Sequence, residues 1–475
     1  METPQETKGR SAWTAELLAT LALSWPLVLT NLAQHGLMAS DVILIGRIGP
    51  EALAAAALGT NIYFAFLIFG IGLVGAVSPL IAEELGRRRH SVREVRRTVR
   101  QGFWASVTVT VPIWIVLWNG EALLRLMGQD PGLSRDAGAY IRTLQWSVLP
   151  FLFYLVLRSF LAALERPGWA LVVSLAGIPV NVGAAFVLIF GHFGVPAFGL
   201  VGAGYATFAS TIFMCLCLVA IISRERRLRR YHLFGRFWRP DWPRFRALWR
   251  IGLPIGLTLA FEVTVFNVTA LLMGRLGVYE LAAHNVTLQI AALCFMVPLG
   301  IGQAVTVRVG RAFGAGDPEG VTRAGWIAYA LGVGFMALTA LMMLVVPGAL
   351  VGVFLDLNDP RNAPVISLAM TFLVLAAIFQ LADGAQAVGA GVLRGLQDTR
   401  VPMIIAAVGY WGIGLPLGIA LAFGTSLRGI GIWIGLATGL AVVAALMSLR
   451  WIQRDRLGLV TGTPQPIAAR EAFAG

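Results

Sequence analysis

Three carboxylates lie inside long apolar stretches of this 475-residue chain: Asp41, Glu262 and Asp383. An ionised group at the centre of a membrane helix costs roughly 2.5 to 3.5 kcal/mol on insertion scales, so such residues are rare and usually functional. Glu262 is near the middle of its stretch, twelve residues after Arg250 and thirteen before Arg275. The three acids therefore predict a path or a binding site for cations.

The other two acids differ in their distance from the nearest arginine. Asp383 lies eleven residues before Arg394, which places it deep in its stretch. Asp41 lies only six residues before Arg47. For Asp41 the alternative is therefore an interfacial carboxylate near a helix end that reaches water.

The composition is that of a membrane protein. Hydrophobic residues make up 57% of the chain and charged residues 13%, which excludes an ordinary soluble domain. A spanning helix needs about 20 mostly apolar residues, and twelve such segments are predicted. They run over residues 15–44, 52–82, 102–120, 137–161, 168–191, 200–222, 251–274, 281–307, 324–354, 365–392, 401–423 and 429–449. Residues 1–14 are a short polar tail, and no cleavable signal is expected before the first segment.

The basic residues alternate from one connection to the next. The connections are numbered by the segment that precedes each of them. Only seven of the 37 basic residues lie in or next to the odd-numbered connections, namely Arg47, Arg125, Arg135, Arg142, Arg275, Arg361 and Arg428. The remainder lie in the tails and the even-numbered connections, so the positive-inside rule predicts that both termini are cytoplasmic. A net charge of +13 could also indicate nucleic acid, but no basic module with interleaved aromatic residues accompanies it. Attraction to anionic membrane lipid accounts for the charge.

The two halves of the chain repeat each other at an offset of 228 residues. Pro26 matches Pro254, and residues 46–49 (Gly-Arg-Ile-Gly) match residues 274–277 (Gly-Arg-Leu-Gly). Six helices is an even number, so the two repeats have the same membrane orientation and are related by a pseudo-two-fold axis along the membrane normal. We therefore expect an all-α membrane protein with two six-helix bundles. The predicted parts are a cytoplasmic tail 1–14, an N-terminal lobe 15–222, a basic cytoplasmic linker 223–250, a C-terminal lobe 251–450 and a cytoplasmic tail 451–475.

The acids are not shared by the two repeats. At the offset of 228, Asp41 aligns with Thr269 and Glu262 aligns with Gln34. The acids are therefore not structural features of the repeat itself, which favours a functional role.

Other polar and aromatic residues are spaced so that they could assist the acids. Thr258 shares a helix face with Glu262, Asn285 and Gln289 are one turn apart, and Phe379 and Gln380 precede Asp383 within about one turn. Hard cations prefer carboxylate, hydroxyl and amide oxygens. The alternative, favoured for Asn285 and Gln289 taken alone, is hydrogen bonding between neighbouring helices.

At the level of motifs the chain resembles the multidrug and toxic compound extrusion (MATE) family, specifically its NorM-type bacterial members. The matching stretches are residues 40–46 (Ser-Asp-Val-Ile-Leu-Ile-Gly), 261–264 (Phe-Glu-Val-Thr), 380–383 (Gln-Leu-Ala-Asp) and 391–395 (Gly-Val-Leu-Arg-Gly). The resemblance covers about residues 15 to 450. It implies a secondary antiporter of the bacterial inner membrane that exports organic, mostly cationic drugs in exchange for Na⁺ or H⁺ by alternating access.

The resemblance also implies roles for individual residues. Glu262 and Asp383 match the cation-binding acids of the C-terminal lobe, and they would be the Na⁺ ligands in a sodium-coupled protein. Asp41 matches the acid of the N-terminal lobe, with Gln34 and Asn181 as polar neighbours. Two departures are Phe379, where relatives often carry tyrosine, and Ala185, where the archaeal proton-coupled branch carries aspartate. We expect no cofactor besides the coupling ion, and a monomer whose partners are drugs and membrane lipid.

Two other classes of protein are alternatives to this one. A lipid-linked oligosaccharide flippase of the same superfamily must hold a pyrophosphate, so it should carry buried arginine or lysine where this chain carries acids. A polytopic membrane enzyme needs a catalytic constellation. The sequence contains no HExxH, GxSxG or Walker motif, so no enzyme activity is expected.

Overall fold

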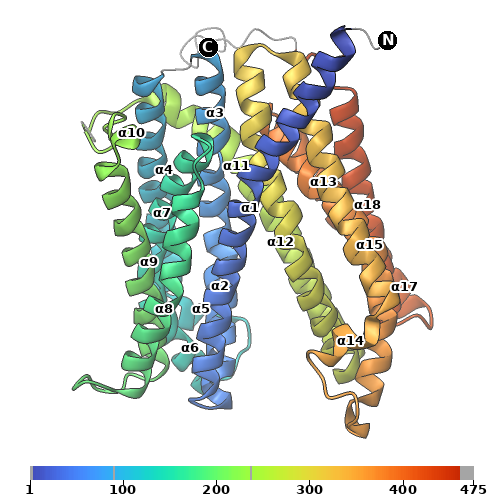
Figure 1. Cartoon of the computed structure of the whole chain (residues 1–475). Helices are drawn as coiled ribbons and strands as arrows, with labels where there is room; N and C mark the ends of the chain where they lie inside the picture. The colour runs from blue at the N-terminus through green and yellow to red at the C-terminus, as the bar shows by residue number, and fades with distance from the viewer. Residues whose placement is uncertain (1–3, 89–90, 236–237, 461–475) are drawn as a thin grey trace. The chain divides into compact units, whose positions relative to one another are not determined.

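The computed structural model describes residues 4–88, 91–235 and 238–460, and this part of the chain is helical without a strand. Twelve of its helices, some of them formed by two consecutive segments, are long and apolar enough to cross a membrane, which confirms the predicted twelve (Figure 1). The α-helices are α1 (Pro4–Gly46), α2 (Pro50–Gly75), α3 (Val77–Arg87), α4 (Val92–Trp118), α5 (Gly120–Leu126), α6 (Pro131–Leu144), α7 (Val148–Ala163), α8 (Gly168–Phe190), α9 (Leu200–Arg224), α10 (Arg226–Arg229), α11 (Trp242–Leu276), α12 (Val278–Ala315), α13 (Pro318–Val345), α14 (Pro347–Gly352), α15 (Ala363–Gly395), α16 (Arg400–Ala406), α17 (Leu415–Gly424) and α18 (Gly429–Ile452). Short 3₁₀ turns η1 (Gln145–Ser147) and η2 (Pro360–Asn362) and a π-helical stretch η3 (Ala407–Gly414) complete them.

Several helices extend well beyond the apolar segments from which they were predicted. Helix α4 begins at Val92 rather than at residue 102, and α11 begins at Trp242 rather than at residue 251. Their added turns are rich in arginine, which is a good helix former and can lay its aliphatic stem along apolar surface. A hydropathy pattern detects only the part of a helix that lies in lipid, so it underestimates the helices that continue into water.

The chain divides into two compact units. One unit contains the described residues up to Val28 and those from Leu257 onward, and the other contains Leu29–Gly256. The divisions therefore fall inside helices α1 and α11, not in the linker 223–250, because packing rather than chain connectivity defines the units. The two division points are 228 residues apart, which is the offset of the sequence repeat.

The same repeat governs how helices approach each other within each unit. In the Leu29–Gly256 unit, a Cβ added to Gly72 on α2 would lie 2.1 Å from the Cα of Gly256 on α11. In the other unit, a Cβ added to Gly300 on α12 would lie 2.4 Å from Cγ2 of Val28 on α1. Both residues of the first contact are 228 positions from those of the second. Since close helix approach in membranes relies on small residues, the repeat preserves a packing contact as well as a sequence.

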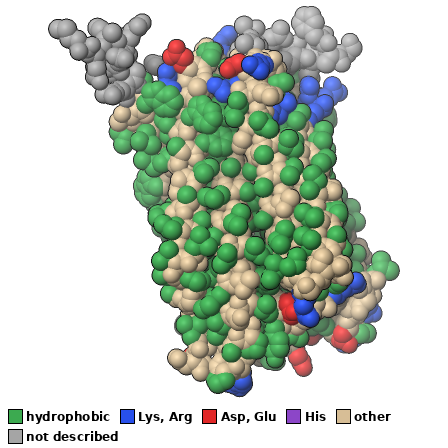
Figure 2. Space-filling model, turned by 90° about the vertical axis from the view of Figure 1, so that its right-hand side faces the viewer, with side chains coloured by type: hydrophobic (Ala, Val, Ile, Leu, Met, Phe, Trp, Pro, Cys, Tyr) green, Lys and Arg blue, Asp and Glu red, His purple; other side chains and the backbone are tan. Residues whose placement is uncertain are grey.

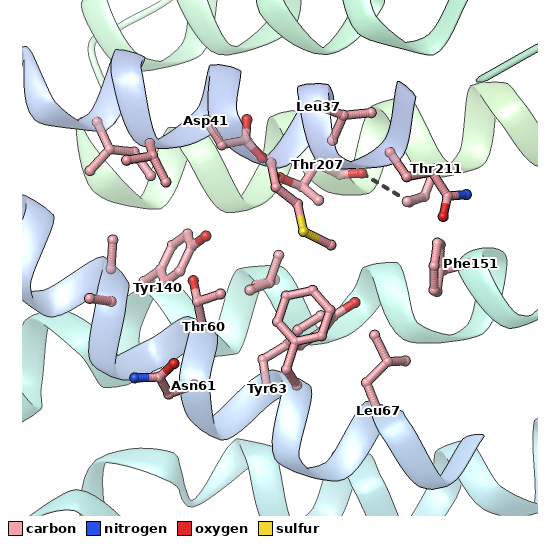
Figure 3. Close-up of a pocket in the computed structure, with 18 of the residues that line it drawn as sticks. Leu37, Asp41, Thr60, Asn61, Tyr63, Leu67, Tyr140, Phe151, Thr207 and Thr211 are labelled. Carbon is pink, nitrogen blue, oxygen red and sulfur yellow. Dashed lines mark hydrogen bonds between the residues drawn. The ribbon is translucent and has the colours of Figure 1, made fainter. Parts of the chain in front are cut away.

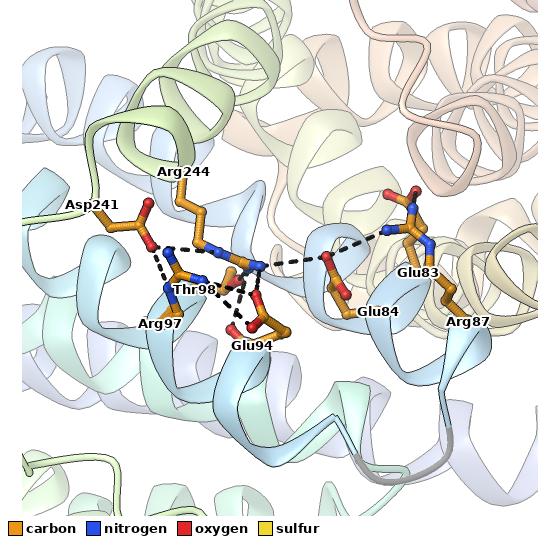
Figure 4. A network of polar contacts seen from close by, with 8 residues as sticks. All are labelled: Glu83, Glu84, Arg87, Glu94, Arg97, Thr98, Asp241 and Arg244. Atoms are coloured by element: carbon orange, nitrogen blue, oxygen red, sulfur yellow. Dashed lines mark hydrogen bonds and ion pairs between the residues drawn. The ribbon is translucent and has the colours of Figure 1, made fainter. Parts of the chain in front are cut away.

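Ion pairs occur at a matched place in both units, with opposite charge on the matched residue. In one unit Glu16 on α1 accepts hydrogen bonds from Arg308 on α12, of which the one from Nε is 2.7 Å long. In the other unit the residue equivalent to Glu16 is Arg244 on α11, which pairs with Glu94 and lies 3.6 Å from Glu84 (Figure 4). The repeat therefore keeps a charged, ion-paired side chain at this position with the opposite sign, but it does not keep the partner, because the residue that matches Arg308 is Leu80.

The described surface separates charged from apolar side chains. On the face shown in Figure 2, charged side chains gather at the two ends, and hydrophobic side chains cover the band between them. Exposed large residues such as Leu338, Leu341 and Ile378 are 64%, 57% and 62% exposed in the absence of a membrane. Such a surface is stable only when lipid covers it, as expected for spanning helices.

Glycines hold the last helices of the Leu257-onward unit together. A Cβ added to Gly435 on α18 would lie 2.4 Å from the Cα of Gly418 on α17, and one added to Gly439 would lie 2.8 Å from the Cα of Gly414. Gly414 ends η3, the π-helical stretch that packs on α18. Short π-helical segments inside helices are frequent at functional sites, and η3 contributes a residue to the cluster described below.

Candidate functional site

A cavity of about 270 Å³ lies inside the Leu29–Gly256 unit (Figure 3). Helices α1, α2, α6, α7 and α9 supply its walls, and most of the lining side chains are apolar. The polar lining residues are Gln34, Asp41, Thr60, Asn61, Tyr63, Tyr140, Thr207 and Thr211. Ligand pockets are commonly of this type, apolar with a few convergent polar groups.

Asp41 places a carboxylate in the wall of this cavity. Its Oδ2 accepts a hydrogen bond of 3.1 Å from the Thr207 hydroxyl on α9, whereas its buried Oδ1 has no hydrogen-bond partner among the described residues. Figure 3 shows the Asp41, Thr60 and Tyr140 side chains around the same space. An oxygen that is buried without a partner is costly, so this carboxylate is placed to receive a cation or a donor group.

The neighbours of Asp41 include residues that the sequence analysis singled out and others that it missed. Gln34 lines the cavity two turns before Asp41, and its Nε2 has no hydrogen-bond partner among the described residues. Asn181 is fully buried near Asp41 and donates to the Ser210 hydroxyl at 3.3 Å. Thr207 and Tyr140 were missed, although a hydroxyl in an apolar run is a recognisable signal.

A second group of polar side chains lies within the Leu257-onward unit. Glu262 on α11 and Asp383 on α15 interact electrostatically with each other. Asp383 is only 6% exposed, while Glu262 is half-buried. The Gln386 side chain, about one turn after Asp383, lies next to Glu262, and its Oε1 has no hydrogen-bond partner among the described residues. The structure thus brings together two acids that are 121 residues apart in the sequence.

Two further residues complete this acid cluster. Tyr410 on η3 is buried, interacts electrostatically with both acids, and its hydroxyl has no hydrogen-bond partner among the described residues. Arg394, near the end of α15, interacts electrostatically with Glu262. Neither Tyr410 nor Arg394 is predicted as a site residue from the sequence. A tyrosine within an apolar stretch is the signal that could have identified Tyr410. No spacing in the sequence connects Tyr410 or Arg394 to α11.

The acid cluster has the oxygen donors that suit a small hard cation. Glu262 and Asp383 supply carboxylate oxygens, Gln386 an amide oxygen and Tyr410 a phenolic oxygen, which are ligand types that such ions prefer. Within the described residues no group of three or more His, Cys, Asp and Glu side chains could hold a metal ion. The cluster therefore offers two carboxylates and neutral oxygens, a set of groups that suits a monovalent cation or a proton.

The supporting residues predicted from the sequence fall into two groups. Phe379 is buried, with its ring centroid 6.1 Å from that of Phe266 and 5.9 Å from that of Trp433, so it belongs to an aromatic core. Gln380 and Thr258 are buried in the same unit. By contrast, Asn285 and Gln289 lie on an exposed face of α12, outside the buried part of the acid cluster. Their predicted contribution to a cation site or to hydrogen bonds between helices stays a prediction.

Comparison with known proteins identifies the protein family that this chain matches. The MatE family model matches residues 26–187 and 254–420. A relative from Mesorhizobium japonicum named "Probable multidrug resistance protein NorM" is 59% identical over 445 residues, which are 94% of this chain and 95% of the relative. A relative of the same name from Brucella suis is 56% identical over 439 residues, which are 92% of this chain and 93% of the relative.

Solved structures have the same fold at much lower identity. The crystal structure of the eukaryotic MATE transporter AtDTX14 has a TM-score of 0.82 at 21% identity and covers 93% of this chain and 96% of its own. The crystal structure of MATE in complex with MaL6 has a TM-score of 0.84 at 20% identity and covers 94% of this chain and 98% of its own. This likeness extends over nearly all of the twelve helices.

Proposed function

This chain belongs to the MATE family and is a membrane transporter rather than an enzyme, and we propose that it exports organic, mostly cationic and amphipathic drugs in exchange for Na⁺ or H⁺. The observation that carries the proposal is the cavity wall around Asp41. It combines a large apolar lining with one carboxylate, of which Oδ1 has no partner among the described residues. An amphipathic cation can satisfy both features at once. The relatives named "Probable multidrug resistance protein NorM" support drugs as the substrates.

The acid cluster supports coupling to a single positive charge. When Glu262 and Asp383 are both ionised, they carry two negative charges, and the neighbouring Arg394 guanidinium offsets one of them. One uncompensated negative charge in a buried site is unfavourable. One Na⁺ bound between the acids, or one proton on either of them, restores neutrality. We therefore propose an exchange of one monovalent cation at this cluster in each cycle.

The transport cycle and the placement in the cell belong to the same proposal. The protein is a multi-pass membrane protein, which we place in the bacterial inner membrane as a monomer with both termini in the cytoplasm. Alternating exposure of the drug cavity requires the two repeats to move relative to each other during the cycle. Occupation of the acid cluster by the incoming cation then disfavours the drug-bound state by altering the balance of charge.

A flippase for lipid-linked oligosaccharides is the competing function. Such a protein must neutralise a pyrophosphate, which requires arginine or lysine in its cavity. The described residues that line the cavity include one acid and neither arginine nor lysine. This charge favours a cationic rather than an anionic substrate.

The purified protein in liposomes, loaded with a fluorescent cationic drug, tests the proposal directly. We expect efflux to accelerate when a Na⁺ gradient or a pH gradient is imposed separately, and only the coupling ion to have this effect. Empty liposomes and protein without a gradient are the controls. If neither gradient changes the efflux rate, then antiport is wrong.

Replacement of Asp41 by asparagine is expected to slow the export of cationic drugs several-fold more than that of neutral drugs. The amide keeps the shape of the carboxylate but not the charge that attracts a cation. The measurement is efflux of a matched cationic and neutral pair from the same liposomes. Asp136→Asn, which changes an exposed acid of the same unit, is the control and should leave both rates unchanged. Equal slowing of both drugs by the Asp41 variant would show that its charge does not contact the substrate.

A further inference from the structure

A second cavity, of about 200 Å³, lies where the start of α4 meets the residues that precede α11. We call it the arginine pocket, because it is lined by Arg93, Arg96, Arg97, Arg100, Arg239, Pro240 and Asp241. All of these residues belong to the Leu29–Gly256 unit. The drug cavity and the acid cluster use none of them, so the function proposed above leaves this pocket unexplained.

Four of the arginines are on one face of α4. Arg93, Arg96, Arg97 and Arg100 follow the spacing i, i+3, i+4 and i+7, which places them side by side on a helix. Arg93 is exposed, whereas Arg100 at the other end of the row is only 6% exposed. The row thus leads from the surface to a buried guanidinium. It also lies at the N-terminal end of α4, where the helix dipole favours an anion.

Like charges are held close together in the arginine pocket. Arg100 is repelled by Arg97, Arg96 and Arg239, and is attracted by Asp241. The Asp241 carboxylate is already engaged, since it accepts a 2.6 Å hydrogen bond from Nε of Arg97 and lies 3.5 Å from Nε of Arg244. One acid therefore faces five arginines in the lining. Such an arrangement is stabilised by an anion that enters the pocket.

The surroundings of the arginine pocket are typical of a membrane surface. The ring of Trp104, one turn after Arg100 on α4, lies 6.3 Å from the ring of Trp238, measured between centroids. Trp238 is 80% exposed and Trp242, at the start of α11, is 62% exposed. Tryptophan is enriched at the level of lipid headgroups, where its ring meets acyl chains and its N–H meets water. The pocket thus combines a site for a negative headgroup with an exposed apolar border for its chains.

We infer that the arginine pocket binds a phosphate group, supplied by an anionic phospholipid. Guanidinium groups bind phosphate oxygens in a bidentate manner, and basic pockets between membrane helices are suited to phosphorylated headgroups. The bound lipid would join α4 to residues 239–241, which lead into α11. The source to be distinguished from lipid is free phosphate, which offers the same oxygens without the chains that Trp238 and Trp242 could contact.

The test uses the full-length protein purified in detergent and stripped of lipid. The midpoint of thermal unfolding is measured with added phosphatidylglycerol, with phosphatidylcholine, and with inorganic phosphate at equal concentration. We expect phosphatidylglycerol to raise the midpoint by several degrees and phosphatidylcholine to have no effect. A rise with inorganic phosphate equal to that with phosphatidylglycerol would overturn the lipid assignment in favour of a soluble anion.

Two sets of variants locate the effect. The triple replacement of Arg93, Arg96 and Arg239 by glutamine should weaken the response to phosphatidylglycerol at least tenfold in the lipid concentration required. The triple replacement of Arg224, Arg226 and Arg227 by glutamine is the matched control, because it removes the same charge from an exposed stretch outside the pocket. An equal response in the two triple variants would overturn the site and leave only non-specific attraction to anionic lipid.

A second measurement applies if the first triple variant is itself unstable. The phospholipid that copurifies with each protein from its membrane is counted by phosphorus analysis, with Arg96→Gln as a milder variant. We expect the wild type and the control to retain more phospholipid than the pocket variants. Equal retention by all four proteins would contradict the proposed site whatever their stability.

Discussion

Coupled drug efflux is expected to fall at least about tenfold when Glu262 is replaced by glutamine or Asp383 by asparagine. Each amide preserves the size of the acid but removes its charge. A unit charge attracts a cation 4 Å away by about 4 kcal/mol at an effective dielectric constant of about 20, so loss of one charge largely abolishes cation binding. The measurement is gradient-driven efflux from liposomes that contain equal amounts of folded protein.

The effect should be specific to the acid cluster. Glu280→Gln provides the matched control, because Glu280 is in the same unit but forms a 2.5 Å ion pair with Arg428 away from the cluster. This variant should keep its coupled efflux. Elution as a single folded species in gel filtration excludes misfolding as the cause of a loss. Wild-type coupled efflux by a folded Glu262→Gln or Asp383→Asn protein would show that the cluster does not carry the coupling ion.

The largest effect on stability is expected at Arg244, whose side chain is only 7% exposed. Its Nη1 donates to the Thr98 hydroxyl at 2.6 Å and to the Glu94 carbonyl oxygen at 3.2 Å, and its charge faces Glu84, Glu94 and Asp241 (Figure 4). Breaking a buried ion pair by removing one partner costs about 3 to 5 kcal/mol, because the other charge is left uncompensated. Arg244→Met should lower the free energy of unfolding by an amount in this range.

The measurement for Arg244 is the midpoint of thermal unfolding in detergent, compared with that of the wild type. Arg246→Met is the matched control, since Arg246 is on the same helix two residues later and is exposed. Its removal changes the net charge equally but should leave the midpoint nearly unchanged. Arg244→Lys keeps the charge but cannot reproduce the forked hydrogen bonds, so an intermediate midpoint is expected. Equal midpoints for Arg244→Met and the wild type would show that the network contributes nothing to stability.

The sequence by itself determined the class of the protein, the number of helices and the internal repeat. Membrane helices must be long and apolar because unpaired backbone groups are not tolerated in lipid, so twelve hydropathic segments were sufficient to predict twelve helices. The resemblance of motifs around Asp41, Glu262 and Asp383 was sufficient to predict the family. Each spanning helix and each motif is local and can be recognised within one stretch of about 20 to 40 residues, and the repeat is recognised by comparing two such stretches.

The tertiary structure decided how the stretches combine. The lobes joined by the linker 223–250 stay a prediction from the sequence; the compact units that packing defines divide within α1 and α11, at positions related by the repeat. Tyr410 and Arg394 join the acids only because η3 and the end of α15 pack in the same unit as α11. The arginine pocket likewise depends on residues 239–241 meeting α4. Contacts between helices distant in sequence leave no periodic signal in any one of them, so only the folded chain could show these sites.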